Sequence, residues 1–111
     1  MIVQKSSVSN IKNMEQYVFI EKDVLVGNGY ININLNTNNI YVFVNPEFRS
    51  QGIGSYITRY MMEMLRSNNI KQTTLMLESN NRHACSMVEK LGAINVSKLD
   101  GITKYILPII K

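Results

Sequence analysis

Apolar and polar residues alternate along the first half of the chain, as they do in strands that bury one face. Residues 31–36 alternate between isoleucine or leucine on one side and asparagine on the other. Residues 16–21 and 40–44 have the composition of two further strands, with turns near residues 22–23 and at the asparagine-rich residues 36–39. Three consecutive strands with short connections predict an antiparallel meander.

The apolar period then changes to that of a helix. The apolar stripe of this predicted helix consists of Ile53, Ile57, Tyr60, Met61, Met64 and Leu65. Asn68 and Asn69 can end it, and residues 73–77 follow as a short buried strand. A second amphipathic helix, over residues 84–91, is closed by Gly92.

Two strand-like runs, residues 94–99 and 103–110, flank Asp100 and Gly101, a dipeptide that favours a tight hairpin. The predicted order is therefore β-β-β-α-β-α-β-β. This order predicts an α/β (α+β) fold, in which a mixed, mainly antiparallel sheet is flanked by two main helices.

Length and composition predict one cytoplasmic domain. The chain of 111 residues has the usual size of a single domain, so residues 1–111 are expected to form one. Its single cysteine, Cys85, forms no intrachain disulfide, in agreement with a reducing compartment. No apolar run is long enough to span a membrane, and residues 1–10 lack the apolar core of a signal peptide. No metal site is predicted.

The net charge of +4 comes entirely from residues 56–111, since residues 1–55 carry four basic and four acidic side chains. A modestly positive half suits an anionic ligand, and a solvated basic surface fits as well. Because basic residues are not clustered among aromatic ones, nucleic acid is not an expected partner.

Glycines interrupt the pattern at two places. Gly27 and Gly29 lie between the turn near residues 22–23 and the alternating strand at residues 31–36, where they indicate a β-bulge or a close approach of another backbone. Gly52 and Gly54 follow the strand that ends at Val44 and open the first helix.

The second glycine pair has the chemistry of an anion site. The first amides of a helix have no partner within the helix and lie at the positive end of its dipole. Glycines allow phosphate oxygens to approach the backbone, and Arg49 adds a positive charge nearby. Two glycines that merely ease a tight turn would give the same pattern. A P-loop is excluded because no Lys-Ser/Thr pair follows the glycines.

Two segments resemble one enzyme family. The residues RSQGIG at 49–54 resemble the Arg/Gln-x-x-Gly-x-Gly/Ala signature of the GNAT N-acetyltransferase superfamily. The residues NRHACSMVEKLGA at 81–93 are similar to the Asn-x-x-Ala/Ser helix of that family, which ends in Glu-Lys-Leu-Gly. The chain is identified as a GNAT-like protein over residues 16–107.

The resemblance implies that acetyl-CoA is the co-substrate. Its pantetheine arm would pair with residues 42–44 in the manner of an added strand, where this strand and the one at Leu75 splay apart. Its pyrophosphate would lie on residues 49–55. Asn81 matches a position that helps to hold the pantetheine arm, although an asparagine here also suits a helix N-cap. The implied coenzyme-contacting residues are Val42, Phe43, Val44, Arg49, Ser50, Gln51, Gly52, Ile53, Gly54, Ser55 and Asn81.

The catalytic groups depart from the family pattern. Many members carry a tyrosine that protonates the departing thiolate, and the aligned residue here is Val88. Tyr105 replaces it only if the last strand bends inward; otherwise it is expected to be a half-buried strand tyrosine. Glu78, at the end of a buried strand, is the candidate base, with a solvated carboxylate as the alternative.

The segment before the meander is also short, because the family usually has a strand and one or two helices there. An open acceptor site, a covering second subunit and a pared-down or fragmentary chain all fit this departure. The resemblance implies an N-acetyltransferase that acts on an amine, and a catalytically weak acyl-CoA-binding or regulatory module is the alternative. Apolar residues such as Val18 and Ile20 on the strands need cover, which favours a homodimer.

Overall fold

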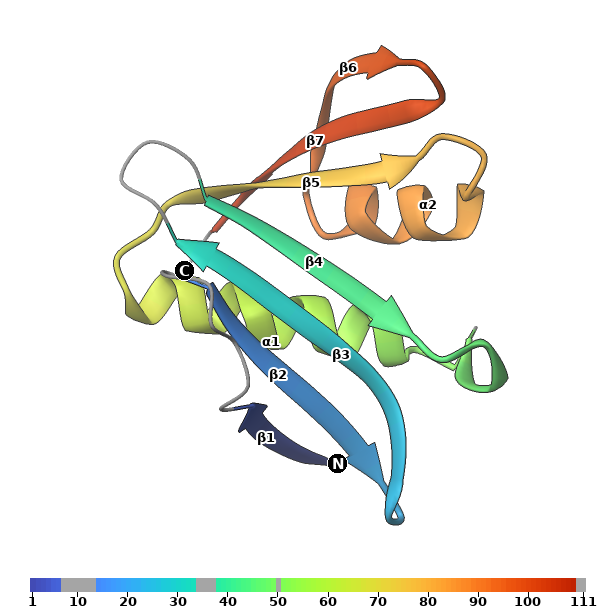
Figure 1. The fold of residues 1–111 in the computed structure, drawn as a ribbon. Coiled ribbons are helices and arrows are strands. Elements are labelled where there is room, and N and C mark those ends of the chain that lie inside the picture. Colours follow the sequence, from blue (N-terminus) through green and yellow to red (C-terminus); the bar gives the residue numbers. More distant parts are fainter. Residues whose placement is uncertain (7–13, 34–37, 50, 110–111) are drawn as a thin grey trace. The chain divides into compact units, whose positions relative to one another are not determined.

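The computed structural model describes residues 1–6, 14–33, 38–49 and 51–109, and these form two compact units, residues 1–61 and 62–111. The first unit contains β1 (Ile2–Ser6), β2 (Met14–Glu21), β3 (Val24–Ile33), β4 (Asn38–Val44), the 3-10 turn η1 (Pro46–Phe48) and most of helix α1 (Ile53–Ser67) (Figure 1). The second unit contains the end of α1, β5 (Gln72–Glu78), α2 (Arg82–Lys90), β6 (Ile94–Leu99) and β7 (Ile102–Pro108).

The strands of the first unit form an antiparallel meander in the order β1-β2-β3-β4. This confirms the three predicted strands, but the prediction of only three strands before the helix was wrong. Strand β1 was missed because it is a short edge strand whose side chains are mostly exposed, so its sequence shows no buried alternation. The predicted alternation at residues 34–36 lies outside the described residues.

Helix α1 lies on one face of this meander, and two glycines of β3 make room for it. A Cβ atom added at Gly27 would lie 2.5 Å from the carbonyl oxygen of Phe43 and 2.8 Å from Cδ1 of Ile57. A Cβ atom at Gly29 would lie 3.1 Å from the sulfur of Met61. The predicted close approach is therefore confirmed. The predicted bulge is present too, as a register shift in the pairing of β2 with β3 beside Gly27.

Aromatic rings fill the rest of the space between α1 and β2. The ring of Phe19 meets that of Tyr60 edge to face at 5.4 Å and that of Tyr56 at 6.2 Å. Tyr17 meets Tyr60 at 5.9 Å. Burial, together with the nearby charge of Glu15, raises the pKa of Tyr17 to about 12, so this phenol stays neutral in the core. The predicted helix stripe is confirmed by its fully buried residues Ile57, Met61 and Leu65.

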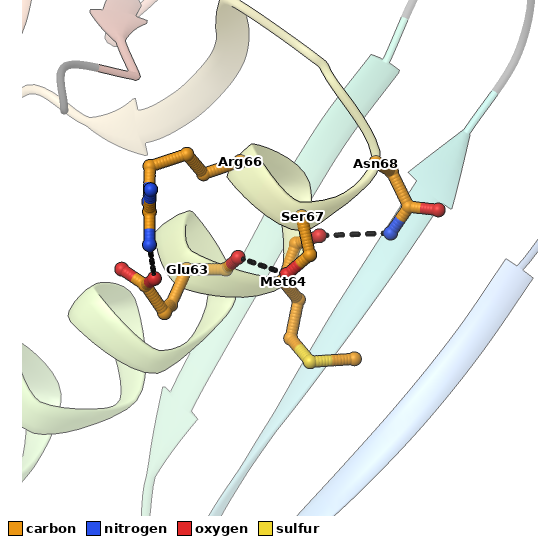
Figure 2. A network of polar contacts seen from close by, with 5 residues as sticks. All are labelled: Glu63, Met64, Arg66, Ser67 and Asn68. Carbon is orange, nitrogen blue, oxygen red and sulfur yellow. Dashed lines mark hydrogen bonds and ion pairs between the residues drawn. The ribbon is translucent and has the colours of Figure 1, made fainter.

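Asparagine side chains and backbone end helix α1, as the sequence predicted. Asn69 adopts a left-handed conformation with φ of 62°, and the amide of Ile70 returns to the carbonyl of Leu65 at 3.0 Å. This pair of features is a Schellman motif. In Figure 2 the Asn68 side chain donates to the Met64 carbonyl at 2.8 Å, one turn back along the helix. Beside it, an ion pair joins Arg66 to Glu63.

The second unit consists of three antiparallel strands in the order β5-β7-β6, with α2 in the connection from β5 to β6. The predicted hairpin is confirmed, because Asp100 and Gly101 have φ values of 52° and 77°. Gly92, with φ of 104°, ends α2 as predicted. Within the described part of the chain, no helix combines the length and the apolar character that crossing a membrane requires.

We predict that Gly27→Ala destabilises the protein by about 1–3 kcal/mol, because the new methyl group would meet backbone as well as Ile57. Gly29→Ala is the matched control, since its methyl group would meet mainly the flexible end of Met61, which can move aside. Urea denaturation measures both free energies of unfolding. Equal losses at the two positions would contradict the proposed rigid contact.

Candidate functional site

The segment that joins β4 to α1 is held to the end of β4 by Arg49. Its Nε donates to the carbonyl oxygen of Val44 at 3.1 Å, and its guanidinium carbon lies 5.8 Å from the centroid of the Phe43 ring. The side chain therefore spans from the strand end to a neighbouring aromatic face, while the residue remains exposed. This arrangement holds the positively charged guanidinium of Arg49 just before the start of the helix.

Gly52 makes the turn into α1. Its φ of 80° is a conformation that other residues adopt at a cost, and a Cβ atom there would have no neighbour within 4 Å. Its carbonyl accepts the first helical hydrogen bond, from the amide of Tyr56 at 3.0 Å. The amides of residues 53–55 precede that bond and lie at the positive end of the helix dipole. Ser50 lies outside the described residues.

The remaining residues of this segment have identified partners. The Gln51 side chain donates to the carbonyl of Glu47 at 3.4 Å, which closes η1 onto the loop. The carbonyl oxygen of Gly54 accepts a hydrogen bond from the buried hydroxyl of Thr58 at 2.8 Å. The Ser55 hydroxyl accepts a hydrogen bond from Nε of Arg59 at 3.3 Å. The loop is thus tied to the first turns of α1 as well as to β4.

The three predicted contact residues of β4 divide between two faces of the strand. Val42 and Val44 pair with Gly29 and Gly27 and lie on the α1 side, where both are half-buried. Phe43 lies on the opposite side and is 46% exposed. A backbone partner alongside β4 would therefore meet alternating aliphatic and aromatic side chains.

Asn81 caps helix α2. Its Oδ1 accepts a hydrogen bond from the amide of Ala84 at 3.2 Å, the N-cap arrangement that the sequence left open as an alternative. This bond uses the side-chain carbonyl only, and the side-chain amide nitrogen is not part of the cap. The residue is exposed.

Glu78 ends β5 with its side chain on the exposed face of the strand. Met76, two residues earlier on the same face, is 49% exposed, whereas Thr73 and Leu75 on the other face are buried. The backbone carbonyl of Glu78 accepts a hydrogen bond from the backbone amide of Asn81 at 3.0 Å, and this bond constrains the backbone more than the carboxylate. The Glu78 side chain is exposed to solvent.

Tyr105 is fully buried, so the expectation of a half-buried strand tyrosine was wrong. Its hydroxyl donates to Oε2 of Glu89 at 2.6 Å. This hydrogen bond, burial and the neighbouring Cys85 together raise the pKa of Tyr105 above its usual value. A thiol ionises near pH 8.5, so a phenol bound in this way is a poor proton donor to a thiolate.

Glu89 is the hydrogen-bond partner of Tyr105 that sequence reasoning missed. It was interpreted only as part of the Glu-Lys-Leu-Gly ending of α2, and the distance of 16 residues from Tyr105 hid the pair. Val88, at the position of the family tyrosine, is buried. In the second unit, the structure brings together Glu78, Asn81 and Cys85 where β5 meets α2; the Cys85 sulfur lies 3.7 Å from the Glu78 carbonyl.

Comparison with known proteins confirms the resemblance drawn from the two motifs. The model of a family described as the acetyltransferase (GNAT) family matches residues 5–93. No curated protein matches the sequence.

Solved structures show the same fold. The ribosomal-protein-S18-alanine N-acetyltransferase of Escherichia coli matches with a TM-score of 0.79 and 16% identity, over 90% of this chain and 72% of that one. An IAA acetyltransferase from Bacillus cereus matches with a TM-score of 0.83 and 11% identity, over 96% of this chain and 98% of that one. The PaiA N-acetyltransferase of Thermoplasma acidophilum, solved in complex with coenzyme A, matches with a TM-score of 0.78 and 14% identity, over 86% and 61%. These likenesses confirm the predicted fold class.

We predict that Tyr105→Phe lowers the free energy of unfolding by about 1 kcal/mol at neutral pH, because the hydrogen bond to Glu89 is lost. The folded-state pKa of Tyr105 is raised, so this contribution is complete below pH 10 and declines as the pH rises further. The difference between the two proteins should therefore shrink at alkaline pH. Thermal unfolding across pH 7–11 measures it. Tyr56→Phe, at an exposed tyrosine, should change stability by less than about 0.5 kcal/mol.

Proposed function

This chain belongs to the acetyltransferase (GNAT) family, and we propose that it transfers the acetyl group of acetyl-CoA to the nitrogen of an amine. The proposal rests most directly on the segment from Val44 to Tyr56. There, an arginine is fixed to the end of β4 and a glycine with positive φ exposes the first amides of α1.

In this proposal the coenzyme pyrophosphate lies on residues 49–55. The first backbone amides of α1 donate hydrogen bonds to the pyrophosphate oxygens. The positive charge of Arg49 balances part of the negative charge of the pyrophosphate. The open space beside Gly52 supports this assignment, because a side chain there would occupy the place of the phosphates. The loop is preorganised by its bonds to β4 and α1, which reduces the entropy lost on binding.

The pantetheine arm then extends along Val42, Phe43 and Val44, and its amides pair with the strand backbone. The side-chain amide nitrogen of Asn81, which its capping bond does not use, is available to a pantetheine carbonyl. Capping and coenzyme binding are therefore compatible roles for this one residue.

Acetyl transfer forms a bond from the amine nitrogen to the thioester carbonyl carbon and breaks the bond from carbon to sulfur. We assign Glu78 as the base that accepts the proton lost by the amine, because its carboxylate is exposed at a fixed strand end. The coenzyme leaves as a thiolate and takes its proton from solvent, since Val88 carries no acid and the Tyr105 hydroxyl is held by Glu89.

We also propose that the enzyme works in the cytoplasm, as a single domain and as a homodimer. The lone cysteine supports the compartment, because a single cysteine cannot form an intrachain disulfide. Large apolar side chains that remain exposed on the strands support the dimer.

One observation favours a second candidate function, an acyl-CoA-binding module with weak catalysis. The tyrosine position of the family is filled by buried Val88, and the nearby tyrosine, Tyr105, is bound to a carboxylate. Such a module would keep the coenzyme loop and lose turnover.

We predict that coenzyme A raises the thermal midpoint. At a concentration 100 times the dissociation constant, the expected stabilisation is about 2.7 kcal/mol. Gly52→Leu should reduce this shift strongly, because the side chain would project into the open space at the loop. Differential scanning fluorimetry with and without coenzyme A provides the measurement.

Gly101→Leu is a closely matched control for that substitution. Gly101 has φ of 77°, close to the 80° of Gly52, and its Cβ position is equally open, but it lies in the β6–β7 turn. Both variants therefore carry the same backbone strain. An equal ligand-induced shift in the two variants would refute the placement of the pyrophosphate at Gly52.

We predict that the protein releases thiol from acetyl-CoA when primary amines are present, and that Glu78→Gln slows this release about 10²–10⁴-fold. The coenzyme-induced thermal shift should remain. Asp23→Asn, at an exposed carboxylate in a turn that asparagine tolerates, should leave the rate unchanged. Wild-type protein that binds coenzyme A but releases no thiol with any amine would establish the binding module instead.

A further inference from the structure

The meander of the first unit has an outer face, which we define as the face of β1–β4 opposite to α1. Two cross-strand rows form its centre. One row contains Val18, Asn28 and Phe43, and the other contains Gln16, Tyr30 and Tyr41. The side chains of both rows are exposed or half-buried.

Within the first unit, α1 leaves the outer face uncovered. All of the ring contacts that hold α1 involve the inner side chains of β2, and its close approach is to the inner face of β3. On the outer face Tyr41 is 43% and Phe43 is 46% exposed. An antiparallel sheet can leave one face to water, but large exposed rings gathered on that face are typical of an interaction surface.

Amide side chains orient the phenols of the outer face. The side-chain nitrogen of Gln16 donates to the Tyr30 hydroxyl at 3.0 Å, and that of Asn39 donates to the Tyr41 hydroxyl at 3.1 Å. Each hydroxyl acts as an acceptor in its bond and can direct its own hydrogen elsewhere. Amides and phenols both donate and accept, so two copies of this face can form hydrogen bonds with each other.

The absence of charge on the outer face favours a second copy of this chain over a charged partner. None of the outward positions of β1–β4 in these registers is lysine, arginine, aspartate or glutamate. In a two-fold dimer each surface meets itself, so any charge near the axis would face its own kind. A protein with a net charge of +4 can associate with itself most readily through a neutral face.

We propose that the outer face binds a second copy of this chain and forms a two-fold dimer centred on the row of Tyr30 and Tyr41. This proposal rests on the homodimer proposed above and adds the surface that forms it. An anionic macromolecule would need cations on this face. The Arg49 guanidinium approaches it only at one end, over Phe43. The second copy would therefore lie next to the coenzyme loop.

Sedimentation equilibrium at micromolar concentration tests the dimer. The wild type should sediment as twice 12.7 kDa, and Tyr41→Lys should weaken association about 100-fold or more, because like charges would be brought together. Tyr56→Lys is the matched control. Tyr56 is also 43% exposed but lies on α1, on the other face, so this variant should remain dimeric. A wild type of 12.7 kDa, or a Tyr41→Lys protein that stays dimeric, would overturn the proposal.

Hydroxyl-radical labelling of wild-type protein provides a second test that needs no substitution. Labelling of Tyr41 should fall as the protein concentration rises into the dimeric range, and labelling of Tyr56 should not. Equal protection of both tyrosines, or of neither, would refute the outer face as the interface. Thiol release, measured on the same samples, separates this proposal from the proposed function. A monomer that turns over acetyl-CoA refutes the homodimer and its interface but not the acetyl transfer, and an inactive dimer refutes the acetyl transfer alone.

Discussion

The contact of helix α1 with strand β3 leaves no room for a side chain at Gly27, and the candidate coenzyme loop depends on this contact. Gly27 pairs with Val44, the last residue of β4, and a Cβ atom added to it would lie 2.8 Å from Cδ1 of Ile57, in the second turn of α1. Both ends of the intervening segment are therefore anchored at one point of β3. Asn45 strengthens the anchor, since its amide donates to the Val26 carbonyl at 2.9 Å. The loop between these anchors has little freedom, which is what a phosphate site requires.

The second unit uses polar bonds where the first uses ring packing. Helix α2 is joined to β7 by the Tyr105–Glu89 hydrogen bond and begins at the Asn81 cap, which is itself bonded to the end of β5. These bonds fix the backbone around Glu78 and leave its carboxylate exposed. The same bonds occupy the buried phenol. The Tyr105 hydroxyl is therefore not free to serve as the acid of the proposed reaction.

The two faces of the first unit differ in composition and burial. Its inner face carries Tyr17, Phe19 and the glycines that admit α1, so it forms the core. Its outer face carries amides and phenols without charge, a composition suited to a reversible contact rather than to a permanent core. Phe43 belongs to the outer face and also supports Arg49, so the proposed interface and the proposed coenzyme loop share one side chain.

The sequence alone determined the predicted elements, because apolar period, turn residues and glycine positions are local properties. It indicated both motifs, and at Gly27 it indicated a bulge or a close backbone approach, because glycine among strand residues is typical of either. The sequence did not reveal β1, whose exposed edge position leaves no periodic pattern, or the pairing of Tyr105 with Glu89 across 16 residues. Only the tertiary structure decided these, because hydrogen-bond partners and the burial of a side chain depend on which segments fold together.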